Sequence, residues 1–417
     1  MKCPIEAYRV NDYVYTLIAA NLTSESPHAP LSNQFPIFRN FPFQFISYHL
    51  SSSHFLNHLN LKPTTMSEYT HHIAILGAGT IGLSMVALHL RRPDTRVTIY
   101  DPREDFTTQV HNQLPSYLET TQDTQEKDPI THLLSTSRLK IATSLREAVE
   151  KATIIQEQSP ERTDSKQELW NQVSKYADPT AHLWSSSSGI PVSAQSEKSP
   201  SDIAQRLVVA HPFNPPHIMP LVEIVPGPHT KAERVEFVKT YFENVPGPKT
   251  KNSSQNLDQT RSESVQHCRP IILRKEIPGF VGNRLAFALL REASYLVGEG
   301  VVSAQDLDSI VTASLGPRWA GSGVFESYHA GGGEGGIGAF LQKLAPTVQD
   351  VWGQLGQIDI LTDAQRDAEG ENVGQREKWR DEVVRQTEEA YGPTVTANTR
   401  AKKERMLRDV LELQKQS

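Results

Sequence analysis

Short apolar runs alternate with amphipathic stretches between residues 72 and 225. The runs occupy residues 72–76, 96–100, 139–143, 153–157, 181–187, 207–211 and 221–225. Near-continuous apolar runs of this length are typical of strands that are buried on both faces. The stretches between several of them have helical spacing, at residues 80–92, 145–152 and 164–177. The alternation predicts an α/β fold in which helices cover both faces of a parallel sheet.

After Pro278 the pattern changes to helices alone. A mostly apolar stripe over residues 281–296 predicts the first helix, and Ser303 is placed to cap a second one that ends at Leu315. Further helices are predicted at about 347–355, 374–391 and 397–416. The last two are strongly charged, so we expect them at the surface.

Two segments have no sustained period. Residues 1–65 combine few charges with an aromatic run broken by prolines, and residues 249–268 are polar with almost no large apolar side chains. We expect the first to be a disordered extension of a functional protein that starts near Met66, with a mitochondrial presequence as the weaker alternative. We expect the second to be a polar loop or insertion. The predicted domains are then residues 66–275 and a smaller, all-helical domain over residues 276–417.

Composition narrows the classes of function. Of the 417 residues, 48 are acidic and 42 basic, a net charge of −6, so no overall cationic field attracts nucleic acid or anionic lipid. Cys3 and Cys268 are the two cysteines and lie far apart, which argues against a disulfide framework or a thiolate metal site and favours a reducing, cytoplasmic compartment. No apolar run approaches the roughly 20 residues of a membrane-spanning helix. We therefore expect no metal, nucleic acid or membrane among the partners.

A glycine-rich turn follows the first run directly. Gly77, Gly79 and Gly82 stand in the segment Gly-Ala-Gly-Thr80-Ile81-Gly, between a predicted strand and a predicted helix. In a dinucleotide site the first glycine allows the tight turn, the second lets the backbone approach the pyrophosphate, and the third lets helix and strand pack closely. The N-terminus of the helix then faces the phosphates. The segment predicts a Rossmann-type nucleotide-binding domain.

Asp101 follows the second run directly. A carboxylate at this place accepts hydrogen bonds from the ribose hydroxyls of an adenosine and repels a 2′-phosphate, which predicts NAD as the cofactor. The alternative is a glycine turn beside a solvent-exposed aspartate. Arg103 leaves NADP open, because its guanidinium could pair with that phosphate.

A histidine and a glutamate stand in the last two runs. His211 ends the run 207–211, and the carboxyl ends of strands are where open α/β sheets bind their ligands. Glu223 interrupts the run 221–225, where a carboxylate is costly unless it has a partner such as an imidazole. From periodicity alone, a core histidine and an edge-strand glutamate account for the pattern equally well.

Several motifs together resemble a known family. The stretch from Ile73 to about Leu344 is similar to the L-3-hydroxyacyl-CoA dehydrogenases in its segments GAGTIG, HPFNPP, LVEIV and PGFVGNR. The resemblance implies a Rossmann domain followed by a helical domain through which relatives dimerise. It also implies NAD-dependent oxidation of the 3-hydroxyl of an L-3-hydroxy acid or an L-3-hydroxyacyl-CoA to the 3-keto product.

The same resemblance assigns roles to individual residues. His211 corresponds to the general acid/base of the family, and Glu223 to the residue that orients it. Ser188 and Asn283 correspond to the contacts of the substrate oxygen. Glu161 and Lys166 correspond to a pair that lies near the nicotinamide.

The substrate is defined less closely. Residues 210–217 and 316–336 resemble the non-CoA branch of the family, which includes L-gulonate 3-dehydrogenase (lambda-crystallin) and carnitine dehydrogenase. Trp319, Phe325 and Tyr328 would then line a cage for a quaternary ammonium, whereas ordinary core packing is the favoured alternative for any one of them. A CoA thioester needs a basic surface for its phosphates, and the basic candidates are too few to decide; they are Arg284, Arg291 and Arg318.

Two other classes of function stay open. One is a catalytically silent NAD-binding protein with a structural or sensing role, as the crystallin relatives suggest; the intact His211 and Glu223 argue against it. The other is a scaffold that binds a partner through the charged helices within residues 374–417.

Overall fold

The computed structural model describes residues 69–118, 128–247, 268–360 and 378–414, with the backbone of residues 6–10 and 13–17. The chain divides into two units, Met1–Met66 and Ser67–Ser417. In the first unit, β1 (Glu6–Val10) pairs antiparallel with β2 (Tyr13–Leu17), a pairing that the sequence pattern did not predict. The rest of the predicted extension lies outside the described residues, as do residues 249–267 of the loop predicted at 249–268.

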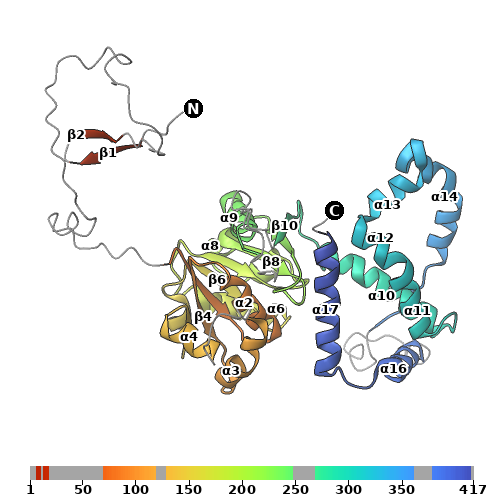
Figure 1. Cartoon of the computed structure of the whole chain (residues 1–417), viewed down its shortest axis with the longest axis horizontal. Helices are drawn as coiled ribbons and strands as arrows, with labels where there is room; N and C mark the ends of the chain where they lie inside the picture. Colours follow the sequence, from red (N-terminus) through yellow and green to blue (C-terminus); the bar gives the residue numbers. More distant parts are fainter. Residues whose placement is uncertain are drawn as a thin grey trace, which may run out of the picture. The chain divides into compact units, whose positions relative to one another are not determined.

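The second unit contains an eight-stranded sheet covered by helices (Figure 1). Its strands are β3 (His71–Leu76), β4 (Thr95–Tyr100), β5 (Leu139–Ile141), β6 (Ile154–Glu157), β7 (His182–Ser185), β8 (Leu207–Pro212), β9 (Leu221–Pro226) and β10 (Arg269–Ile272). Their order in the sheet is β10-β9-β8-β7-β6-β3-β4-β5. Every run that was predicted to be a strand forms one, so the α/β class is confirmed.

One pair departs from the predicted parallel sheet. β8 and β9 are antiparallel, while the other neighbouring strands of this sheet are parallel. The connection over residues 213–220 is too short for the crossover that a parallel pair requires. The expectation of a wholly parallel sheet was therefore wrong at this edge.

The core lies on both faces of the sheet. Ile73 and Ile75 of β3 belong to one buried cluster, and Ala74 and Leu76 belong to the other, because successive residues of a strand point to opposite faces. The first cluster includes residues of α2 (Thr80–His89), α3 (Phe106–Tyr117), α4 (Pro129–Ser135) and α9 (Ala232–Glu243). The second includes residues of α5 (Leu145–Val149), α6 (Thr163–Val173), α7 (Val192–Ser196) and α8 (Ser201–Arg206).

The direction of winding reverses at β3. β4 lies on one side of β3 and β6 on the other, so the connection after β4 and β5 returns across the sheet. In open α/β sheets, such a reversal opens a crevice outside the carboxyl ends of the two strands, and ligands bind there. The turn after Leu76 and the turn after Glu157 flank this crevice.

The chain is helical after β10. The elements are α10 (Gly282–Gly298), α11 (Ala304–Ile310), a π-helical turn (Val311–Leu315), α12 (Gly316–Gly321), α13 (Val324–Gly331), a 3-10 turn (Gly333–Gly335), α14 (Gly336–Gln354), α16 (Lys378–Tyr391) and α17 (Ala397–Gln414). Ser303 caps α11 as predicted, since its hydroxyl accepts a hydrogen bond from the Asp306 amide. The helix predicted from about residue 347 begins earlier, at Gly336, and continues through Pro346. Among the described residues, no helix is long and apolar enough to cross a membrane.

Candidate active site

The turn between β3 and α2 fits only glycine at two positions. Gly77 has a φ of +115°, and a Cβ there would lie 2.8 Å from the carbonyl oxygen of Gln158. A Cβ on Gly82 would lie 2.0 Å from the carbonyl oxygen of Gly77, so α2 can approach the turn only with glycine at this place. Gly79, in contrast, has open space where its Cβ would stand. That opening is what a pyrophosphate requires in order to approach the backbone.

The first turn of α2 is open to a ligand. Gly79 is the N-cap and supplies no side-chain hydrogen bond; it and Thr80 are exposed, and Ile81 is half-buried. The first N–H groups of a helix have no partner within the helix and attract anions. The predicted dinucleotide residues therefore lie together, with their N–H groups at the crevice of the sheet, and fit NAD.

Asp101 is held at the end of β4, where an adenosine ribose is expected. Its Oδ2 accepts a hydrogen bond of 2.7 Å from the Ala78 amide. Its carboxylate also forms a two-bond pair with Arg103, from Nε to Oδ1 at 2.8 Å and from Nη2 to Oδ2 at 2.8 Å. Burial raises the pKa of Asp101, but these hydrogen bonds outweigh it and hold the pKa below its ordinary value.

His211 and Glu223 form a buried pair. The antiparallel register of β8 and β9 sets the two residues opposite each other, and Nδ1 of His211 lies 2.9 Å from Oε2 of Glu223. Their side chains are 4% and 3% exposed. The second oxygen of Glu223, Oε1, accepts hydrogen bonds from the amides of Val281 (3.0 Å) and Gly282 (2.8 Å) at the start of α10.

These contacts determine the state of the pair. Burial raises the pKa of Glu223, but the hydrogen bond from His211 and that from the Gly282 amide outweigh it and hold the pKa below its ordinary value. An ionised carboxylate only accepts hydrogen bonds, so His211 carries its proton on Nδ1. Nε2 is then the nitrogen that can accept a proton from a substrate. Sequence reasoning suggested this pair, and the structure brings it together.

Ser188 and Asn283 also meet. Nδ2 of Asn283 donates a hydrogen bond of 2.8 Å to the carbonyl oxygen of Ser188. Ser188 is the last of four consecutive serines, residues 185–188, and the environments of these serines differ. Ser187 is buried and its hydroxyl donates to Oε1 of Glu161 at 2.6 Å, whereas Ser188 is exposed. Ser188 is therefore the better placed of the two to meet a substrate.

Glu161 and Lys166 hold the same loop. Oε1 of Glu161 accepts hydrogen bonds from the amides of Ser188 (2.8 Å) and Gly189 (3.0 Å), and Oε2 lies 3.3 Å from Nζ of Lys166. Burial raises the pKa of Glu161, but the Ser187 hydrogen bond and the Lys166 charge hold it below its ordinary value. The two residues therefore fix the loop that carries Ser188.

Glu157 joins this network, and the sequence reasoning missed it. Its carboxylate is fully buried and lies 2.8 Å from Nζ of Lys166, which is 1% exposed. It also accepts hydrogen bonds from the hydroxyl groups of Ser159 and Ser185. The signal was a carboxylate at the end of the apolar run 153–157, of the same kind that drew attention to Glu223.

The three predicted cage residues lie on α12 and α13 of the helical region. Trp319 on α12 is 40% exposed, and Phe325 and Tyr328 on α13 are 78% and 46% exposed. The ring of Tyr328 packs against Phe340 at 4.8 Å. Among the described residues, no ring contact joins the three to His211, and the exposure of Phe325 does not fit the alternative of core packing either.

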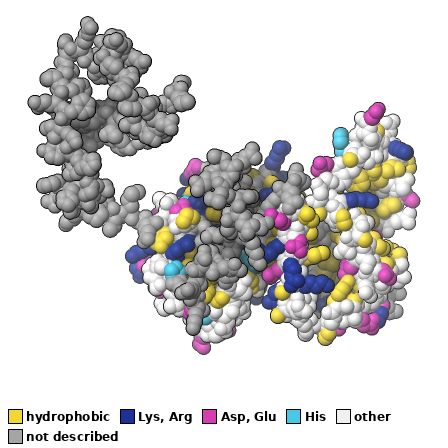
Figure 2. All heavy atoms as spheres, viewed as in Figure 1, with side chains coloured by type: hydrophobic (Ala, Val, Ile, Leu, Met, Phe, Trp, Pro, Cys, Tyr) yellow, Lys and Arg dark blue, Asp and Glu magenta, His cyan; other side chains and the backbone are white. Residues whose placement is uncertain are grey.

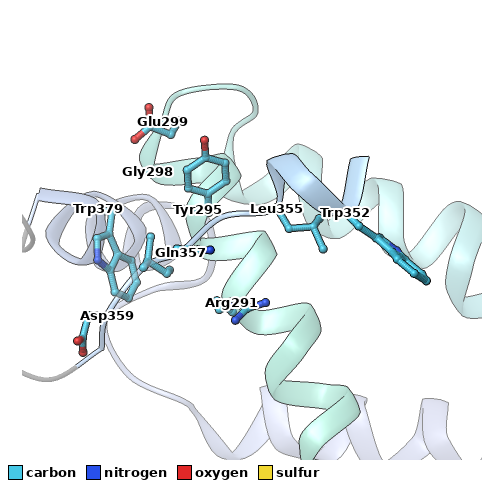
Figure 3. Close-up of a pocket in the computed structure, with 10 residues that line it drawn as sticks. Arg291, Tyr295, Gly298, Glu299, Trp352, Leu355, Gln357, Asp359 and Trp379 are labelled. Atoms are coloured by element: carbon cyan, nitrogen blue, oxygen red, sulfur yellow. The ribbon is translucent and has the colours of Figure 1, made fainter. Parts of the chain in front are cut away.

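A cavity of about 760 Å³ lies in the helical region (Figure 3). Residues of α10, the end of α14 and the start of α16 line it, among them Arg291, Tyr295, Trp352 and Trp379. It shares no residue with the cluster around His211 and Asp101, so it is separate from the candidate active site.

Fold and site together are those of a nicotinamide-dinucleotide dehydrogenase: a glycine turn at the reversal of a mainly parallel sheet, and a buried His–Glu pair on β8 and β9. Residues 72–250 match the family model for the NAD binding domain of 3-hydroxyacyl-CoA dehydrogenase, and residues 279–355 match that for its C-terminal domain. The chain belongs to the 3-hydroxyacyl-CoA dehydrogenase family. It is an oxidoreductase that acts on CH–OH groups, and its cofactor is NAD.

Individual relatives agree with this assignment. The chain is 35% identical over 286 residues to a 3-hydroxyacyl-CoA dehydrogenase of Gibberella moniliformis, which covers 68% of this chain and 80% of the relative. It is 33% identical over 331 residues to an L-carnitine dehydrogenase of Pseudomonas sp, covering 76% of this chain and 93% of the relative. Among solved structures, the NAD+-dependent dismutase 5-formyl-3-hydroxy-2-methylpyridine 4-carboxylic acid 5-dehydrogenase shares the fold, with a TM-score of 0.57 and 21% identity over 83% of this chain and 98% of that one.

Proposed function

We propose that the chain oxidises the 3-hydroxyl of an L-3-hydroxy acid or an L-3-hydroxyacyl-CoA to a ketone, with His211 as the general acid/base. The observation that carries the proposal is the buried pair in which Glu223 fixes Nδ1 of His211, while its other oxygen is held by two amides of the PGFVGNR segment. A merely structural histidine would not require a carboxylate that is itself so closely positioned.

In the proposed reaction, the CH–OH group of the substrate loses a proton from its oxygen and a hydride from its carbon. His211 accepts the hydroxyl proton on Nε2, and the ionised Glu223 stabilises the imidazolium that results. NAD, which the glycine turn at residues 77–82 and Asp101 would hold, would supply the hydride acceptor for the same carbon, and that carbon would become the carbonyl carbon. Ser188 and Asn283 orient the substrate oxygen. In the reverse direction, His211 returns the proton to the ketone oxygen.

The substrate is tested with a panel. The relatives named L-carnitine dehydrogenase make L-carnitine the first compound to assay, beside L-gulonate, 3-hydroxybutyrate and 3-hydroxybutyryl-CoA. Formation of NADH is followed for each. We expect turnover of at least one compound. Binding of NADH without turnover of any of them would favour the catalytically silent alternative.

Replacement of the base tests the mechanism. We expect His211→Gln to lower kcat by about a hundredfold to ten-thousandfold, the usual contribution of a general acid/base. The affinity for NADH should stay nearly unchanged, because the glycine turn is a separate part of the site. His229→Gln, an exposed histidine in the loop after β9, is the matched control. Full activity of His211→Gln would contradict the proposed role.

We further propose that the protein is a homodimer. Apolar side chains are exposed along α10 and α14, among them Leu285 (62%), Phe287 (58%), Leu290 (50%) and Trp352 (64%). Figure 2 shows hydrophobic side chains at the surface of this helical part. Exposed apolar surface of this kind is typical of an interface. Sedimentation equilibrium should therefore give twice the chain mass.

A cytoplasmic compartment is part of the same proposal. Cys268 is a buried free thiol, and burial raises its pKa to about 12. A free thiol is compatible with a reducing compartment, but a buried one would also persist elsewhere. Fractionation of the source cells is the test, and recovery of the protein in the mitochondrial fraction would favour the presequence alternative.

A further inference from the structure

The carboxylate of Asp101 is already fully engaged. Oδ1 accepts hydrogen bonds from the amide (3.0 Å) and Nε (2.8 Å) of Arg103. Oδ2 accepts hydrogen bonds from the Ala78 amide (2.7 Å) and from Nη2 of Arg103 (2.8 Å). A ribose that binds here must therefore share or replace donors supplied by Arg103. The negative charge that would repel a 2′-phosphate is also paired with a guanidinium.

The pair with Asp101 does not use all the N–H donors of Arg103. A guanidinium has five N–H groups in a fixed plane, and the pair with Asp101 uses two of them. The Arg103 side chain is 46% exposed, whereas that of Asp101 is 7% exposed. The remaining N–H groups can meet a phosphate while the ion pair stays intact, in the manner typical of arginine at phosphate sites.

Other charges near Arg103 limit this effect. Glu104 and Asp105 follow it directly and are exposed, and the charge of Asp105 contributes to the raised pKa of Arg103, after the hydrogen bond to Asp101. Both carboxylates oppose a phosphate. With the attraction of Arg103 opposed by these two carboxylates, we expect the site to tolerate a 2′-phosphate but not to prefer it.

We propose that Arg103 is a specificity-determining residue that makes the adenosine end of the site tolerant of a 2′-phosphate. The protein then binds NADPH within about tenfold of its affinity for NADH. This inference rests on dinucleotide binding alone and does not depend on which hydroxy acid the enzyme oxidises.

The test measures binding without substrate. The full chain is titrated with NADH and with NADPH, and the fluorescence of the bound reduced nicotinamide gives the two Kd values. For the wild-type protein we expect a ratio of Kd for NADPH to Kd for NADH of about ten or less. Arg103→Ala should raise this ratio at least about tenfold, because Asp101 loses its counter-charge and regains its repulsion. Its affinity for NADH should be equal or greater, since the carboxylate is released for the ribose.

Three further variants separate the effects of charge, of donor geometry and of repulsion on the ratio of the two Kd values. Arg103→Lys retains the charge without the planar donors and should give an intermediate ratio. Asp101→Ala removes the repulsion itself and should lower the ratio below that of the wild type. Arg146→Ala, on α5, removes an exposed arginine that pairs with Glu150, and should leave the ratio unchanged.

Two results would overturn the inference. One is a wild-type ratio above about ten, and the other is an Arg103→Ala protein whose two Kd values change together or not at all. If the wild-type protein does not bind NADH at all, the dinucleotide site itself is contradicted. If the protein binds NADH and NADPH but oxidises no compound of the substrate panel, only the proposed reaction is contradicted.

Discussion

Glu223 uses its two oxygens for different purposes. Oε2 binds the imidazole of His211, and Oε1 binds two backbone amides of the helical region. Three hydrogen bonds to the ionised form keep its pKa below the ordinary value despite burial, so the charge is present throughout the pH range of an enzyme assay. That charge lies directly against the imidazole of His211.

Glu223→Gln should therefore lower kcat. The amide keeps the shape of the side chain but loses the charge that stabilises an imidazolium on His211 in the proposed reaction. We expect a smaller loss of kcat than for His211→Gln. Glu233→Gln, an exposed glutamate on α9, is the control, and a wild-type kcat in Glu223→Gln would mean that the pair is structural.

Residue-level reasoning from the sequence found carboxylates singly and not their networks. Glu223 could be predicted because a histidine stood nearby in the chain and at the end of a neighbouring run. Glu157 also ended an apolar run, but its network could not be predicted, because its partners come from α6 and from β7 and meet it only in the folded chain. Arg103 was noticed as a charge, but its pair with Asp101 depends on the bend of the chain after β4.

At the scale of elements, two glycines of one turn should respond differently to alanine. Gly82→Ala places a methyl group 2.0 Å from the carbonyl oxygen of Gly77, so α2 must shift and Tm should fall by several degrees. Gly79→Ala meets no atom within 4 Å, so Tm should be unchanged. NADH affinity should nevertheless fall in Gly79→Ala, since the methyl group occupies the approach to the pyrophosphate. Thermal melts and NADH titrations of both variants check this, and equal effects on Tm would contradict it.

The predictability of elements follows their burial. The strands of the central sheet could be predicted because burial on both faces makes them nearly continuous apolar runs. β1 and β2 are only five residues long and do not alternate strictly between polar and apolar positions, so they do not stand out in a segment without a period. The start of α14 was missed because Gly333, Gly335 and Gly336 precede its apolar stripe and Pro346 interrupts it.

For the whole molecule, buried and half-buried histidines predict a loss of stability in acid. Burial lowers the pKa of His72, His89 and His217 to about 4 and that of His182 to about 3, from an ordinary value of 6.5. Below pH 6.5 the unfolded chain binds protons that the folded chain does not, so unfolding becomes more favourable. The contribution to stability is complete above pH 6.5 and is lost progressively as the pH falls toward 4.

Melting curves at several pH values check this expectation. Tm should fall steadily from about pH 6.5 to about pH 4.5. His89 is a suitable probe because it is fully buried between Tyr241 and Gln156, at 2.9 Å and 2.7 Å. His89→Gln should lower Tm at neutral pH but reduce the slope in acid. A Tm that is constant over this range would contradict the assignment.

Residues before Met66 should be dispensable for binding and folding of the second unit. They form a separate unit, and the family match begins at residue 72. A chain that starts at Met66 should keep the Tm and the NADH affinity of the full chain. A loss of several degrees, or weaker NADH binding, would show that the segment stabilises the dehydrogenase unit.

Glu223 ties the antiparallel pair of strands to the first turn of α10. Its Oε1 accepts hydrogen bonds from the amides of Val281 and Gly282, and Asn283 in the same turn donates one to the carbonyl oxygen of Ser188. In the proposed reaction, the orientation of the base and that of the substrate oxygen therefore depend on a single turn of helix. A substitution that displaces this turn should disturb both, and we expect it to lower kcat more than it raises KM.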